Sequence, residues 1–128
     1  MRFNTVLSAI IIVMILPVTQ LSIADETAIG TMAEIMINLK HFPSESDKQK
    51  LQAIADSSER SEAEIVVAIA ITNFKHQAAA ADNEKLNAIV ADETTPAELR
   101  DLAAVIVSTN HSPSASNIAK LENIIPEH

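Results

Sequence analysis

The chain contains no cysteine, tryptophan or tyrosine, and it has a single glycine in 128 residues. Without cysteine it has no disulfide framework, no thiol nucleophile and no lipid anchor attached through a cysteine. Without tryptophan and tyrosine it lacks the ring platforms on which sugars and single nucleic-acid strands stack. The single glycine argues against β-hairpins, whose tight turns need Gly or Asn. These shortages favour a helical protein that relies on its hydrophobic core.

Motifs for catalysis and strong positive charge are missing as well. The sequence has no Gly-x-Ser-x-Gly turn, no glycine-rich phosphate loop and no heme-attachment motif. It carries 17 acidic against 9 basic residues, a formal net charge of −8, and its basic residues form no run. We therefore expect no binding to nucleic acid or anionic lipid. We predict a non-enzymatic protein, with an unrecognised hydrolase as the alternative. The acidic surface is expected to be simply solvated, with a cationic ligand or partner as the alternative.

The first residues are typical of a secretory signal peptide, expected to span 1–24. Arg2 precedes an apolar run over 6–18, and two small residues stand at the third and first positions before Asp25. A membrane-spanning helix needs roughly 20 apolar residues, and this run is interrupted too early. We therefore predict cleavage before Asp25 and export to a periplasm or the exterior. The mature single domain, 25–128, is expected not to associate with membranes.

A register of 35 residues runs through the rest of the chain. It relates identical residues in three copies: His41, His76 and His111; Lys50, Lys85 and Lys120; Leu51, Leu86 and Leu121; and Ile54, Ile89 and Ile124. A fixed period of a few tens of residues is the signature of stacked supersecondary units. We therefore expect three copies of one unit, spanning roughly 25–58, 59–93 and 94–128.

Each unit is predicted to begin with a long helix that ends at a histidine. The stretches 65–71 and 102–107 are apolar nearly all round, as in a helix buried between others. Residues 61–64 and 95–98 have the spacing of a capping box, in which a hydroxyl and a Glu three residues later each bind a backbone amide. Helices are therefore expected to begin near 61 and 95.

A shorter helix is predicted to follow each histidine. The three are expected over Ser44 to about Asp56, Ala79 to about Ala91, and Ser114 to about Ile125. Their inward stripes are predicted to be Leu51, Ile54 and Ala55; Leu86, Ile89 and Val90; and Leu121, Ile124 and Ile125. In the middle unit an alanine run, 78–81, leaves the two helices free to run together or to join by a loose bend. The fold class is all-α: three tandem helical hairpins that form a compact bundle or a short right-handed α-solenoid.

The joint between the two helices of each hairpin carries the sharpest candidate residues. These are Lys40 and His41, Lys75 and His76, and Asn110 and His111. At a helix end, cationic side chains favour the negative end of the helix dipole and cap free carbonyls, and this structural role accounts for the histidines. We therefore predict no metal and no cofactor. The three histidines are nevertheless the metal-ligand candidates, since imidazole is a common ligand.

Geometry weighs against a shared metal in an open stack. Successive units would lie about 10 Å apart, whereas bonds from imidazole to a metal are about 2 Å long, so only closure of the stack would bring the histidines together. Phe42 and Phe74 are expected to serve core or joint packing rather than a ligand cage. We predict a module that binds an unidentified protein or peptide through the edge of the histidine joints. The alternative is a metal or heme carrier that uses those histidines.

Overall fold

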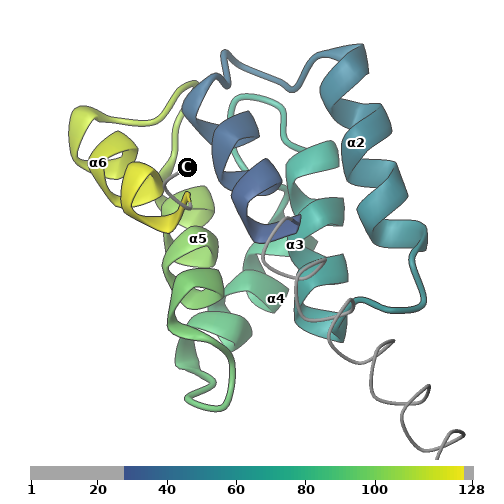
Figure 1. The fold of residues 1–128 in the computed structure, drawn as a ribbon. Coiled ribbons are helices and arrows are strands. Elements are labelled where there is room, and N and C mark those ends of the chain that lie inside the picture. Colours follow the sequence, from purple (N-terminus) through teal and green to yellow (C-terminus); the bar gives the residue numbers. More distant parts are fainter. Residues whose placement is uncertain (1–27, 126–128) are drawn as a thin grey trace, which may run out of the picture.

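The computed structural model describes residues 28–125. Residues 28–37 are helical and precede α2 (Glu45–Asp56), α3 (Glu62–Thr72), α4 (Ala80–Ala91), α5 (Ala97–Ser108) and α6 (Ala115–Ile124), as Figure 1 shows. No β-strand occurs within 28–125, so the all-α prediction is confirmed. The predicted signal peptide, 1–24, lies outside the described residues.

The helices after the histidines begin and end within about one residue of their predicted limits. The predicted contrast between long and short helices is wrong, because α2 to α6 all have 10 to 12 residues. Helices α3 and α5 are shorter than expected, since the chain leaves helical geometry before it reverses at His76 and His111. The same reversal separates α3 from α4 at His76, so these two helices neither run together nor join by a loose bend.

Serine side chains start three of the helices, as the sequence predicts. The Ser44 and Ser114 hydroxyls each accept a hydrogen bond from the amide three residues later, at 3.1 Å in both cases. At Ser61 the full capping box forms, because Glu64 also accepts from the Ser61 amide at 3.2 Å. The second predicted capping box is wrong. Helix α5 is capped by Pro96 without a side-chain bond, and the Thr95 hydroxyl donates to Asp92 instead.

The core repeats with the register of the sequence. Fully buried side chains occupy equivalent positions on the helices before the histidines: Met32, Val67 and Leu102; Ala33, Ala68 and Ala103; and Met36, Ile71 and Ile106. Helix α3 contacts α2, α4 and α5, and α5 also contacts α4 and α6. The packing is compact, and α3 and α5 lie between the helices that flank them in sequence (Figure 1).

The helices after the histidines bury a narrower stripe. Leu51, Leu86 and Leu121 are fully buried, and the three isoleucines three residues later are buried as well. Val90 is wrong as a core residue, because 37% of it is exposed. Val90 follows Ile89 on α4, on a side of the helix that meets solvent. Among the described residues, no helix has both the length and the apolar character that crossing a membrane requires.

Candidate functional site

The chain reverses direction at each of the three histidines. His41, His76 and His111 have φ angles of 69°, 65° and 69°, and they are the positive-φ residues of the described chain. The two residues that flank each histidine pair with each other across the turn as an isolated antiparallel bridge. Left-handed backbone costs a residue with a Cβ roughly 1–2 kcal/mol, although His, Asn and Asp tolerate it better than most. The chain therefore adopts the same energetically unfavourable turn at three equivalent positions.

Backbone hydrogen bonds join the three turns into a closed ring. The His41 amide donates to the His111 carbonyl at 2.6 Å, and the His76 amide donates to the His41 carbonyl at 2.6 Å. The His111 amide completes the ring by donating to the His76 carbonyl at 2.5 Å. Every histidine thus uses its own amide and its own carbonyl within the ring. We call these three hydrogen-bonded residues the histidine ring.

Side-chain bonds brace two of the three turns. The Asn73 amide group donates to the Asp82 carboxylate at 3.2 Å, across the turn at His76. At the same place in the next turn, the Asn117 amide group donates to the Ser108 hydroxyl at 3.1 Å. Asp82 and Asn117 are both buried, where a satisfied polar contact fixes geometry more firmly than it would in water. These contacts tie the helix before each of these histidines to the helix after it.

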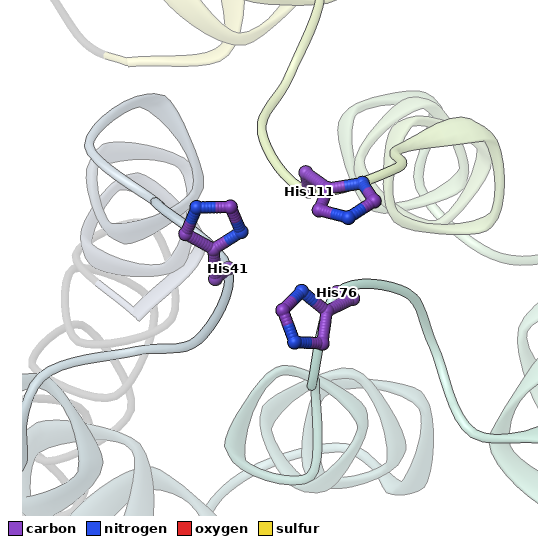
Figure 2. Close-up of side chains that lie close together, drawn as sticks. All are labelled: His41, His76 and His111. Carbon is purple, nitrogen blue, oxygen red and sulfur yellow. The ribbon is translucent and has the colours of Figure 1, made fainter.

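The three imidazoles lie close together and are exposed. Figure 2 shows them grouped around a common centre, each carried by a separate loop. Their ring centroids are 5.1 Å apart for His41 and His76, 5.3 Å for His41 and His111, and 4.9 Å for His76 and His111. One nitrogen from each side chain lies within 4.8 Å of the other two, and all three residues are exposed. Together they are a candidate site for a metal ion.

The structure changes how the sequence candidates are to be understood. In an open stack the three histidines would lie too far apart to share a metal. The histidine ring instead brings them together, because the first turn bonds directly to the last. Lys40, Lys75 and Asn110 are exposed next to the histidines. No acidic residue stands within three positions of any of the three histidines, so the nearest side chains in sequence add no negative charge.

The two phenylalanines of the described chain have different environments. Phe74 is 1% exposed and belongs to the core, as predicted. Phe42 is 58% exposed and is not a core residue. Phe42 lies one residue after the left-handed turn at His41, in a position whose counterparts in the other turns are the exposed residues Gln77 and Ser112. A sequence pattern that places Phe beside a helix end does not distinguish these two situations.

The hydrogen bonds of the histidine ring are the main feature that sequence reasoning missed. They connect backbone atoms of residues 41, 76 and 111, so no side-chain pattern encodes them directly. One signal was available: His recurs at the point where each copy must reverse, and His is among the residues that tolerate positive φ.

Comparison with known proteins found no match. The chain matches no protein-family model, no curated protein and no solved structure, so no family is assigned to it.

Proposed function

We propose that this chain binds a transition-metal ion through His41, His76 and His111. The observation that supports the proposal is the convergence of three exposed imidazoles, with one nitrogen of each within 4.8 Å of the others. The proposed architecture is three copies of one helical hairpin, closed around the histidine ring, with one ligand contributed by each copy. In this arrangement the threefold repeat is what makes the site, because a single hairpin offers only one imidazole.

The geometry requires only a small adjustment to accept an ion. On a tetrahedral Zn²⁺ with Zn–N bonds of 2.0–2.1 Å, imidazole nitrogens stand roughly 3.3 Å apart. Closing from a spacing of 4.8 Å requires each nitrogen to move inward by roughly 0.8 Å. Exposed side chains can make this movement by rotating about their χ angles, while the hydrogen-bonded backbone stays in place. The ring thus supplies the preorganisation, and the side chains supply the fit.

The donor set indicates the class of metal. Three imidazoles without a thiolate or carboxylate suit Zn²⁺, Cu²⁺ and Ni²⁺ better than the hard ions Mg²⁺ and Ca²⁺, which prefer oxygen. Three protein ligands also leave a coordination position open, unlike the closed four-ligand sites that serve structure alone. Because the histidines are exposed, that position would face solvent. This favours a metal-binding or carrier role for the exported domain.

Binding of a protein or peptide partner through the same edge stays a prediction. The exposed side chain of Phe42, next to His41, supports it. A solvent-facing metal would give such a partner an anchor.

The proposal is tested by thermal unfolding of the purified protein after treatment with EDTA, with and without added Zn²⁺ or Cu²⁺. A ligand at a hundredfold excess over its Kd stabilises a folded protein by about 2.7 kcal/mol. For a domain of this size the Tm should then rise by roughly 10 °C or more. His76→Asn should abolish most of the rise and keep the turn, because Asn also tolerates positive φ.

His128→Asn is the matched control, since it removes the one histidine outside the ring and should leave the rise intact. An unchanged Tm for the unsubstituted protein across Zn²⁺, Cu²⁺ and Ni²⁺ would refute the proposal. A rise that persists when each ring histidine is replaced in turn would refute it equally.

A further inference from the structure

A pocket of about 380 Å³ opens beside the histidine ring. It is lined by Phe42, Lys48, Thr72, Phe74, Lys75 and His76. The pocket therefore lies where the loop after His41 and the start of α2 meet the end of α3. Its volume falls within the range of sites for small organic ligands, roughly 300–1,000 Å³.

An exposed aromatic side chain, Phe42, forms one wall of this pocket. Both phenylalanines of the described chain line it, Phe74 as part of the core and Phe42 as an exposed wall. A large aromatic side chain that stays 58% exposed leaves apolar area in contact with water. Burying that area under an apolar ligand is favourable, and a ring stacked on Phe gains further from its geometry.

The charges in the pocket all have one sign. Lys48 and Lys75 line it, and no acidic residue within 28–125 does, in a chain whose formal net charge is −8. Lys48 has one acidic neighbour, Glu45, at 3.6 Å, but the Glu45 side chain is 91% exposed. Such an exposed pair is weak and can exchange its carboxylate for that of a ligand. A second pocket of about 400 Å³ shows the contrast, because Glu62 and Asp92 line it together with Lys85.

Two of these features, Phe42 and Lys48, occur in the first copy only. At the position of Phe42 the other copies carry Gln77 and Ser112, and at the position of Lys48 they carry Asn83 and Ile118. Several core positions, in contrast, stay apolar in all three copies, for example Met36, Ile71 and Ile106. Since the other two copies do without Phe and Lys at these places, the fold itself does not require them. The combination therefore points to a ligand.

We propose that this pocket binds a small organic anion with an apolar body, of the class of aromatic carboxylates. The carboxylate pairs with the ammonium groups of Lys48 and Lys75, and the apolar body packs against the exposed ring of Phe42. Charged hydrogen bonds fix the orientation of the anion, and ring contacts supply most of the buried area. This site does not depend on a metal, although His76 lines the pocket and also belongs to the histidine ring.

Phenylacetate is a suitable probe, titrated into the EDTA-treated protein and followed by calorimetry and by the NMR signals of Phe42 and His76. We expect saturable binding that weakens by about tenfold in the double variant Lys48→Gln, Lys75→Gln, because both charge-assisted contacts are lost. Phenylacetamide, the neutral analogue, should bind at least tenfold more weakly than phenylacetate for the same reason. Phe42→Ala should weaken binding as well, and its exposed position leaves the core unaffected.

Lys50→Gln is the matched control, since Lys50 is exposed on α2 and does not line the pocket. It should bind phenylacetate like the unsubstituted protein. The proposal is overturned if phenylacetate does not bind, if the amide binds equally well, or if the double variant and Lys50→Gln behave alike. Because the titration contains EDTA, these outcomes are independent of whether the histidines bind a metal.

Discussion

The variant His76→Gly should have a higher free energy of unfolding than His76→Ala, although both substitutions remove the imidazole. His76 has a φ of 65°, in the left-handed region that costs a residue with a Cβ roughly 1–2 kcal/mol and costs glycine almost nothing. Glycine loses about 0.4–1 kcal/mol of this advantage, because its unfolded state has more conformational freedom. The remaining difference is about 1 kcal/mol in favour of His76→Gly over His76→Ala, or about 4–8 °C in Tm for a domain of this size.

The assay is urea and thermal unfolding of both variants in EDTA, so that metal binding does not contribute. Helix α4 provides the control at Ala88, which is exposed in regular helical geometry. Ala88→Gly should lower the free energy of unfolding by about 1 kcal/mol, the opposite sign for the same exchange of alanine for glycine. If the free energy of unfolding of His76→Gly does not exceed that of His76→Ala, the left-handed backbone at position 76 is not a source of strain.

Two further predictions concern helix starts and loops. Ser61→Ala should lower the free energy of unfolding by about 1–2 kcal/mol, because it removes a capping box. Thr95→Ala should change the free energy of unfolding by less than about 0.5 kcal/mol, because Thr95 does not cap α5. Equal losses for the two variants in urea unfolding would contradict the capping assignment. Hydrogen bonds from the Thr94 hydroxyl and amide hold the pKa of Asp92 below its ordinary value of 3.8. The charged Asp92 carboxylate therefore stabilises the fold above about pH 4, and this stabilisation disappears as the pH falls through the lowered pKa. The Tm of Asp92→Asn should therefore lie below that of the unsubstituted protein at pH 7 and approach it toward pH 3, and a difference in Tm that does not vary with pH would contradict the role of the charge.

Much of the fold follows from local signals in the sequence. The starts of α2, α3 and α6 could be predicted because Ser44, Ser61 and Ser114 bind amides only three residues away. The buried stripe on α2, α4 and α6 could be predicted from helical periodicity, which is also a property of short sequence segments. The Thr95 cap failed because α5 begins one residue later than the spacing predicts, with Pro96 at its N-cap, and the Thr95 hydroxyl instead donates to Asp92.

The candidate site could be predicted only in part. The recurrence of histidine every 35 residues identified the three candidate ligands, but whether they meet depends on how the chain closes in space. That closure rests on backbone bonds between residues far apart in sequence, such as His41 and His111. Periodicity describes what each copy buries and does not describe how the first copy meets the last.

The histidine ring also sets how the molecule responds to shortening. A linear array can lose a terminal repeat and keep the interfaces between the others, because each repeat contacts only its neighbours. In the ring, removing any one turn leaves one amide and one carbonyl without the partners they have in the complete protein. The bond between residues 41 and 111 forms only when nearly the whole described chain is present, which makes it a late event during synthesis. The number of turns is therefore part of the structure, because three turns complete the ring and two leave it open.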